Sequence, residues 1–439
     1  MKFSNLPLSL TDMSAPVIGI ASRTQTPKGL RLHIGLFGRR NAGKSSLINA
    51  LTNQKIAIVS DVPGTTTDPV EKACELAPIG PVVFIDTAGV DDVGELGGLR
   101  TERSLAVLGW VDVALIVCDA KALTESELEL IRTVKSTATP TVVVLNKADT
   151  ADAKELIATQ EQVRSLGYEP VTVCASQKLN IDAVREAIVK LAQNAVEPDL
   201  PLLGDLVHPG DTVMLVTPID TGAPKGRMIL PQVQAIREVL DADAKCIVVR
   251  ENRLAGTLTN EKEPPAFVVT DSQVVQSVVA QTPKTIPVTT FSIQMAYSKC
   301  DLVEMARGAA MIDFLRPGDK VMICETCSHH PQPDDIGRKK LPRWLAKKVG
   351  GELDIEVVVG KDFPVDLTPY KLILQCGGCV VTRRHMLTRL AQAKRQNIPM
   401  TNYGVAISHL QGVLERALEL HPKALKAFHE AREIFANHF

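Results

Sequence analysis

The sequence predicts an α/β protein of about three domains, and three observations support this prediction. The chain has 439 residues, which suffices for about three domains of roughly 150 residues each. Apolar residues make up 45% and charged residues 23% of it, as in ordinary globular proteins. Short apolar segments alternate with helix-like ones, a pattern typical of parallel sheets covered by helices. We place the domains at 31–199, 200–280 and 281–439, after an N-terminal segment of residues 1–30.

Charge and hydropathy argue against several classes of protein. Lys plus Arg (49) nearly balance Asp plus Glu (50), and only 4% of residues are aromatic, so neither a polyanion-binding surface nor a base-stacking platform is expected. No apolar run reaches the roughly 18 residues of a membrane-spanning helix. Pro16 and Gly19 interrupt the short apolar stretch near the N-terminus, which argues against a secretory signal. We expect a cytoplasmic protein with no nucleic-acid and no membrane partner.

The first predicted strand, 32–37, runs into a glycine-rich loop and then into a helix at 46–51. The loop has the pattern GxxxxGKS, in which glycines let backbone N–H groups point at a phosphate. Lys44 would neutralise the outer phosphates and Ser45 would bind magnesium, while the start of the helix adds its positive dipole end. The predicted nucleotide-binding residues of this loop are Gly38, Asn41, Ala42, Gly43, Lys44, Ser45 and Ser46.

The second predicted strand, 81–85, ends in Asp86-Thr87-Ala88-Gly89. Asp86 can hold magnesium through water, and the N–H of Gly89 can sense the terminal phosphate of a nucleotide. Further strands at 115–118 and 141–145 follow, with helices between them, and a helix at 181–193 closes the domain.

The strand at 141–145 ends in Asn146-Lys147-Ala148-Asp149. Here the sequence resembles the GTPase family, whose NKxD signature reads guanine. The resemblance implies that Asp149 accepts hydrogen bonds from the N1–H and the amino group of guanine, which favours GTP and GDP over ATP. The residues that it implies for base binding are Asn146, Lys147, Asp149, Ala175 and Ser176.

The segment Gly64-Thr65-Thr66-Thr67-Asp68 resembles the first switch of the Era and tRNA-modification GTPases. The resemblance implies that Thr66 binds magnesium and that Asn41 helps to hold a potassium ion; the alternative for Asn41 is capping of its loop. Val90 stands where Ras-like GTPases have the glutamine that positions water, so we expect slow, potassium-stimulated hydrolysis. The predicted catalytic residues are Lys44, Asn41, Thr66 and Gly89.

The middle of the chain predicts a small α/β unit. A linker at 197–199 is followed by a strand at 211–217, a helix at 230–240 and a strand at 245–249. A unit this small buries limited surface by itself, so we expect it to pack against a second copy as a homodimer.

The last third again alternates strands with helices, as in a doubly wound sheet. Predicted strands lie at 320–323, 354–359, 371–374 and 398–401, and predicted helices at 344–349, 385–396 and 411–419.

Two pairs of cysteines, Cys324/Cys327 and Cys376/Cys379, each follow a predicted strand. Ligands gather at the carboxyl ends of such strands, and thiols at CxxC spacing indicate a metal or a redox pair. A zinc site, an iron–sulfur cluster and a dithiol all remain open on these residues alone. The other five cysteines are isolated and are expected to be buried and free: Cys74, Cys118, Cys174, Cys246 and Cys300.

The succession of a potassium-type GTPase domain, a small α/β domain and these cysteines resembles the HydF family, the maturation GTPases of iron-iron hydrogenases. The resemblance implies a 4Fe-4S cluster held by Cys327, Cys376 and Cys379, with His329 as a fourth, exchangeable ligand. Gln375 stands where the family usually has a histidine, and Cys324 is an additional thiol, which is either a fourth ligand or a packed strand residue.

The HydF resemblance implies a GTP-hydrolysing scaffold. It would carry the cluster, receive a dinuclear iron precursor from radical-SAM maturases and deliver it to the FeFe-hydrogenase apoprotein. The expected cofactors are therefore GTP/GDP, Mg²⁺, K⁺ and the 4Fe-4S cluster. Two alternatives are an RNA- or ribosome-associated GTPase and a zinc-stabilised regulatory GTPase.

Overall fold

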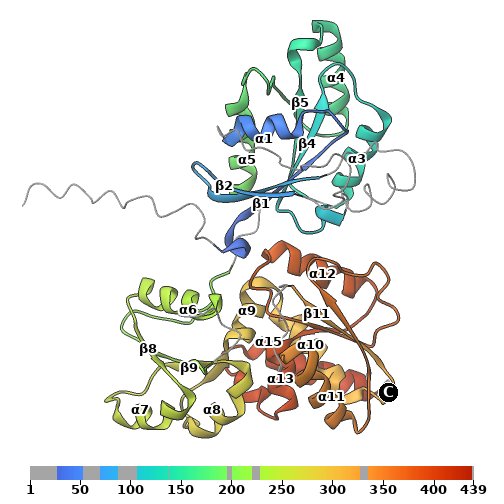
Figure 1. The fold of residues 1–439 in the computed structure, drawn as a ribbon. Coiled ribbons are helices and arrows are strands. Elements are labelled where there is room, and N and C mark those ends of the chain that lie inside the picture. The colour runs from blue at the N-terminus through green and yellow to red at the C-terminus, as the bar shows by residue number, and fades with distance from the viewer. Residues whose placement is uncertain are drawn as a thin grey trace, which may run out of the picture.

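The computed structural model describes residues 27–52, 70–87, 106–137, 139–194, 200–219, 228–326 and 335–437. These residues form three α/β units, each built on its own sheet (Figure 1). Among them, no helix is both long and apolar enough to cross a bilayer.

The first unit is a six-stranded sheet in the order β2-β3-β1-β4-β5-β6, parallel except for β2. Its strands are β1 (Leu32–Phe37), β2 (Val70–Leu76), β3 (Gly80–Asp86), β4 (Val113–Asp119), β5 (Thr141–Asn146) and β6 (Val171–Thr172). Its helices are α1 (Lys44–Thr52), α3 (Glu125–Ser136), α4 (Ala153–Ser165) and α5 (Ile181–Asn194).

Successive strand residues of this sheet enter different cores, because side chains alternate between the two faces of a strand. Leu36 packs in one core with α1 and α5, whereas Phe37 packs in the other with α3 and α4. Helices therefore cover both faces of the first sheet, which confirms the predicted alternation of strands and helices in the first unit.

The second unit is a parallel four-stranded sheet in the order β10-β9-β7-β8. It contains β7 (Thr212–Val216), β8 (Lys245–Val249), β9 (Phe267–Thr270), β10 (Val288–Thr290), α6 (Leu230–Asp241), α7 (Leu254–Asn260) and α8 (Val275–Gln281). Because β10 pairs with β9, this sheet continues past residue 280. Strand β8 is an edge strand, and Val248 on it is 42% exposed.

The third unit is also a parallel four-stranded sheet, in the order β12-β11-β13-β14. Its strands are β11 (Lys320–Glu325), β12 (Asp354–Val359), β13 (Leu372–Gln375) and β14 (Met400–Asn402). Its helices are α9 (Phe291–Lys299), α10 (Leu302–Ala309), α11 (Leu341–Val349), α12 (Arg383–Arg395), α13 (Tyr403–Leu410), α14 (Leu414–Ala417) and α15 (Pro422–Ala436).

The predicted helix at 411–419 is wrong in extent, since only α14 forms there. Gly412 takes a positive φ of 72°, a conformation that ends regular helix and suits glycine.

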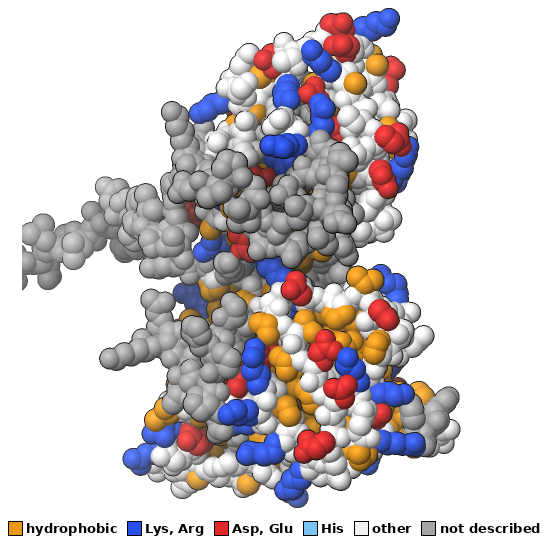
Figure 2. Space-filling model, turned by 45° about the vertical axis from the view of Figure 1, so that its right-hand side comes forward, with side chains coloured by type: hydrophobic (Ala, Val, Ile, Leu, Met, Phe, Trp, Pro, Cys, Tyr) orange, Lys and Arg blue, Asp and Glu red, His pale blue; other side chains and the backbone are white. Residues whose placement is uncertain are grey.

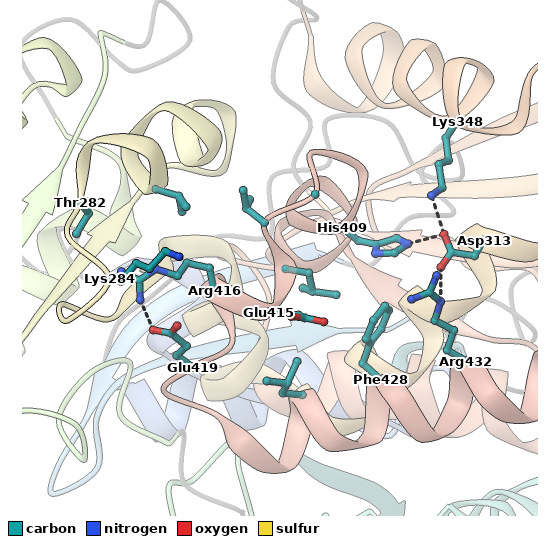
Figure 3. Close-up of a pocket in the computed structure, with 15 residues that line it drawn as sticks. Thr282, Lys284, Asp313, Lys348, His409, Glu415, Arg416, Glu419, Phe428 and Arg432 are labelled. Carbon is teal, nitrogen blue, oxygen red and sulfur yellow. Dashed lines mark hydrogen bonds and ion pairs between the residues drawn. The ribbon is translucent and has the colours of Figure 1, made fainter.

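Charged side chains around Asp313 connect helix α15 to the rest of the third unit (Figure 3). Lys348 Nζ lies 2.8 Å and His409 Nε2 lies 2.9 Å from Asp313 Oδ1, and Arg432 Nε of α15 lies 3.1 Å from Oδ2. Burial raises the pKa of Asp313, but hydrogen bonds from His409 and Lys348 outweigh it and bring the pKa below its ordinary value. These charges line a cavity of about 860 Å³. We interpret them as ion pairs that stabilise the packing of α15 in the third unit.

Residues before β1 lie against the third unit. The short helix η1 (Lys28–Leu30) places Gly29 at the CxxC turn, where a Cβ on Gly29 would come 2.6 Å from the carbonyl oxygen of Cys379. Lys299 Nζ donates to the Gly29 carbonyl at 2.7 Å. The chain therefore touches the cysteine region before it enters the first sheet.

Candidate functional site

The glycine-rich loop has a backbone that only glycine fits at two positions. Gly38 has a φ of 143°, and a Cβ there would come 2.2 Å from the carbonyl oxygen of Val117. Gly43 has a φ of 93°, and a Cβ there would come 2.2 Å from Asn146 Nδ2. The loop can therefore pack tightly between two strand ends and keep its N–H groups facing a ligand.

Lys44 and Ser45 begin α1 directly after this loop. Lys44 Nζ donates to the carbonyls of Gly38 at 2.8 Å and Arg39 at 3.0 Å, which holds the ammonium within the loop. Ser45 Oγ donates to Asp86 Oδ2 at 2.9 Å. The two predicted magnesium-binding side chains therefore meet, although β1 and β3 are separated by more than 40 residues of sequence.

The pKa of Asp86 is raised, chiefly because its carboxyl is buried. The hydrogen bond from Ser45 and the charges of Lys44 and Lys72 act in the opposite direction. A bound cation would favour the ionised carboxylate further, since a nearby positive charge lowers the pKa of an acid.

Asn146 connects the phosphate loop to the last base-contacting loop. Its Nδ2 donates to the carbonyl of Ala42 at 2.9 Å, and its Oδ1 accepts from the N–H of Ala175 at 3.0 Å. Asp149 accepts from Cys174 Sγ at 3.0 Å, which orients the carboxylate expected to read guanine.

The structure brings most of the predicted nucleotide residues around one cavity of about 490 Å³. Its lining consists of Asn41, Gly43, Lys44, Ser45, Ser46, Asn146, Lys147, Asp149, Thr150 and Ser176. Thr66 and Gly89 lie outside the described residues.

Asp119 is a residue of this site that sequence reasoning missed. It ends β4 and accepts from Arg39 Nη2 at 3.0 Å and from Lys147 Nζ at 3.3 Å. Burial raises its pKa, but the N–H of Lys121 and the Lys147 ammonium outweigh that effect and lower it. Asp119 thus joins the phosphate loop to the NKxD segment; the available signal was a polar residue at the carboxyl end of a buried strand.

The cysteine region lies at the carboxyl ends of β11 and β13, which are neighbours in the third sheet. Thr326, the last described residue before position 327, donates its N–H to Cys376 Sγ at 3.2 Å, and its Oγ1 lies 3.1 Å from the same sulfur. Gln375 Nε2 lies 3.5 Å from that sulfur. Hydrogen-bond donors therefore surround Cys376 in the way that suits an anionic sulfur.

Cys379 follows Cys376 through a tight turn. Gly378 has a φ of 68°, and a Cβ there would come 2.8 Å from Met386 Sδ, so this position requires glycine. Burial raises the pKa of the Cys379 thiol to about 11, and the neighbouring Cys376 acts in the same direction. Bound iron or zinc would reverse this, because a coordinating thiol is deprotonated by the metal.

Cys324 is a packed strand residue. It is fully buried in the core of the third unit, and burial raises the pKa of its thiol to about 12. Its thiol also lies close enough to Cys376 for the two sulfurs to interact electrostatically. Cys324 and Cys376 thus differ in burial, since Cys376 is only partly buried.

The ligand set implied by the HydF resemblance is only partly within the described residues. Cys376 and Cys379 are described, whereas Cys327 and His329 are not. Within the described ranges, no three His, Cys, Asp or Glu side chains are grouped as a metal site would group them. One observation fits a further group at this place: the buried hydroxyl of Tyr403, whose pKa is raised by burial and then by Cys376, has no hydrogen-bond partner among the described residues.

Comparison with known protein families gives three matches along the chain. Residues 33–147 match the family described as 50S ribosome-binding GTPase. Residues 202–300 match the Hydrogen maturase F dimerization domain, and residues 303–420 match the Hydrogen maturase F tetramerization domain.

Curated relatives match the first unit. The tRNA modification GTPase MnmE of Trichormus variabilis is 38% identical over 167 residues, which are 37% of this chain and 34% of that protein. GTPase Der of Wolinella succinogenes is 34% identical over 172 residues, which are 37% of this chain and 36% of that protein. The chain thus spans about a third of the length of these relatives. Among solved structures, a variant of Aquifex aeolicus Era bound to GDP.AlF4- has 20% identity and a TM-score of 0.33, covering 50% of this chain and 93% of that one.

The fold and the site define a P-loop GTPase domain followed by two further α/β domains. Both of those domains match families described as domains of hydrogen maturase F. The chain belongs to the hydrogen maturase F (HydF) family, and the family descriptions support the expected self-association.

Proposed function

We propose that this protein is a GTP-hydrolysing scaffold of FeFe-hydrogenase maturation, which binds a 4Fe-4S cluster and delivers a dinuclear iron precursor to the apo-hydrogenase. One observation carries the proposal: a single chain combines a guanine-type P-loop site with the two HydF domains, the second of which contains the cysteine region. Radical-SAM maturases would supply the precursor, which is cargo and not a resident cofactor.

The nucleotide site supports hydrolysis through charge neutralisation. Lys44 would contact the outer phosphates, and Ser45 with Asp86 would hold magnesium, directly and through water. Asn41 lines the same cavity with an exposed side chain, where it could help to bind potassium near the transferred phosphate. Both cations would stabilise negative charge that develops in the transition state.

The base end of the cavity supports GTP as the nucleotide. Asp149 is held by Cys174 Sγ and by Gln177 Nε2, at 3.0 and 3.3 Å. A fixed carboxylate accepts the two adjacent N–H donors of guanine, and adenine does not present that pair of donors.

The cysteine region supports an anionic metal–sulfur group. Cys327, Cys376 and Cys379 would hold the cluster, with His329 as an exchangeable fourth ligand. When bound, a 4Fe-4S cluster supplies one-electron chemistry and an iron with an open position. The protein's own contribution is the set of hydrogen-bond donors at Cys376.

A homodimer through the second unit is part of the proposal. Among the described strands, β8 pairs only with β7. On α6, which contacts β8, Val233 and Leu240 are 49% and 57% exposed. An open edge flanked by apolar side chains is a template for strand pairing with another chain.

An RNA- or ribosome-associated function is the alternative that the relatives of the first unit favour. On the face drawn in Figure 2, the basic and acidic side chains of the described residues are intermixed. Filter binding to ribosomal RNA at physiological salt would test this alternative.

The decisive experiment is anaerobic purification followed by metal analysis and electron paramagnetic resonance. We expect about four iron and four sulfide per chain when the cluster is loaded, and a signal on reduction that changes when the precursor binds. One zinc per chain without iron would refute the cluster function and favour the zinc-stabilised alternative.

A further inference from the structure

We infer that Arg389 is the buried counter-charge of the cysteine region and acts on Cys376 through Gln375. Arg389 of α12 and Gln375 of β13 are thus positioning residues outside the implied ligand set. This assignment rests on the proposed function, because an anionic metal–sulfur group is what the charge would face.

Arg389 is a buried cation with neutral hydrogen-bond acceptors. Its side chain lies in α12 and is 3% exposed. Nη1 donates to Gln375 Oε1 at 2.9 Å, and Nη2 donates to the carbonyls of Gly360 and Asp362 at 3.0 and 3.2 Å. The guanidinium also lies 4.9 Å from the centre of the Phe363 ring.

No carboxylate of the described residues forms an ion pair with Arg389. Burying a charge without an opposite charge is costly, so buried charges in proteins are usually paired or bind metals. Burial accordingly lowers the pKa of Arg389, while Cys324, Cys376 and Asp362 act against that effect. Cys324 is packed in the core, and Asp362 accepts from Arg389 through its backbone carbonyl. The negative charge that would balance Arg389 is therefore expected at Cys376.

Gln375 connects this charge to Cys376. A guanidinium can only donate hydrogen bonds, so the atom of Gln375 that faces Arg389 is the amide oxygen. The amide nitrogen is then directed to the other side, where it lies 3.5 Å from Cys376 Sγ and 3.4 Å from the carbonyls of Cys324 and Cys376. Arg389 thus fixes which end of a fully buried glutamine meets the sulfur.

Thr326 completes this arrangement from the neighbouring strand end, since its N–H and hydroxyl are within 3.2 Å of the same sulfur. Hydrogen bonds to cluster sulfurs and nearby positive charge favour the more negative, reduced state, and so raise the reduction potential. Glutamine at position 375 therefore has a physical role that requires no iron coordination: it accepts from an arginine and presents N–H to a cysteine.

The test is a redox titration of the full-length protein, loaded with iron and sulfide, with electron paramagnetic resonance as the readout. Arg389→Met removes the charge at similar length, and Arg389→Lys retains it. Arg395→Met, at an exposed position of the same helix, is the matched control. In Arg389→Met we expect the ratio of reduced to oxidised cluster at fixed potential to fall about tenfold, equivalent to about 59 mV for one electron. Arg389→Lys and Arg395→Met should retain most of the wild-type ratio.

Equal reduction potentials in wild type and Arg389→Met would overturn the inference. If Arg389→Met takes up no iron, iron uptake by Arg389→Lys would support a role of the positive charge. If neither Arg389 variant takes up iron and Gln375→Met has the wild-type reduction potential, the inference is refuted. Gln375→Met removes the N–H donor while leaving Arg389 in place, and a lower potential is expected. Absence of any iron–sulfur signal in the wild-type protein would instead refute the proposed function.

Discussion

The ammonium of Lys361 lies 3.3 Å from the centre of the Trp110 ring and bonds to Glu71 at 2.5 Å. Lys361 follows β12 in the third unit, whereas Glu71 and Trp110 belong to the GTPase domain. His385 of α12 stacks on the same Trp110 ring. The cysteine-bearing unit therefore contacts the GTPase domain through a cation held between a carboxylate and an aromatic face.

Replacing Lys361 with Met should weaken this contact by about 1–2 kcal/mol, the range for partly buried cation–π pairs. We expect faster hydrogen exchange in β2 and α12, measured by mass spectrometry, with GTP affinity little changed. Lys347→Met, at an exposed position of α11, is the control. Unchanged exchange in both segments would show that the contact is not populated in solution.

Lys44→Ala should abolish GTP hydrolysis, because it removes the charge that the phosphate loop holds in place. The visible absorbance of the cluster should be retained, since Lys44 and the cysteines belong to different units. The measurements are phosphate release and an absorbance spectrum on one sample, with the exposed Lys190→Ala as the control. Loss of both signals would contradict the separation of the two sites.

Asn41→Ala should remove the stimulation of hydrolysis by potassium, lowering the rate on the order of 10²-fold if the ion acts as a transition-state stabiliser. The rate in sodium and the affinity for GDP should change little. Equal wild-type rates in potassium and sodium would exclude the potassium site and leave loop capping as the role of Asn41.

Asp313→Asn should destabilise the protein at neutral pH by about 1 kcal/mol, because Lys348 and Arg432, whose side chains are 41% and 56% exposed, lose their shared carboxylate but stay hydrated. The pKa of Asp313 is lower in the folded than in the unfolded chain. Its stabilising contribution is therefore present above its unfolded pKa of about 3.9 and is lost as the pH falls towards the folded value. Urea unfolding should show a gap between wild type and variant at pH 7 that narrows below about pH 4, and the exposed Asp354→Asn should show little effect.

Val248→Lys should weaken the homodimer at least about tenfold, since a lysine on an exposed edge strand opposes pairing with another strand. Light scattering over a concentration series measures this, with Ala255→Lys on the exposed side of α7 as the control. An unchanged molar mass at every concentration would place the dimer contact elsewhere.

The features that could be predicted from the sequence are local ones. The phosphate loop lies between a strand and a helix that are its immediate neighbours, so spacing alone placed Lys44 and Ser45. Strand β2 was missed because only every second residue of it is buried, which gives no continuous apolar run. It pairs antiparallel with β3 at the edge of the sheet.

The features that could not be predicted depend on distant parts of the chain. Arg389 resembles any other helical arginine until Gly360 and Gln375 are folded against it. Lys361 and Trp110 lie far apart in the sequence, and nothing near either residue indicates the other. Similarly, Asp119 gains its role only when Arg39 and Lys147 meet at the end of β4.

The position of Gly29 shows that a segment can precede one unit in sequence and yet pack against another unit in the folded chain. Gly29 precedes the GTPase domain in sequence, but it packs against the turn that contains Cys379. A fragment beginning at residue 200 would lack this contact even though it contained every cysteine of the cysteine region. Metal-binding studies on such a fragment would therefore describe a different environment from that of the intact chain.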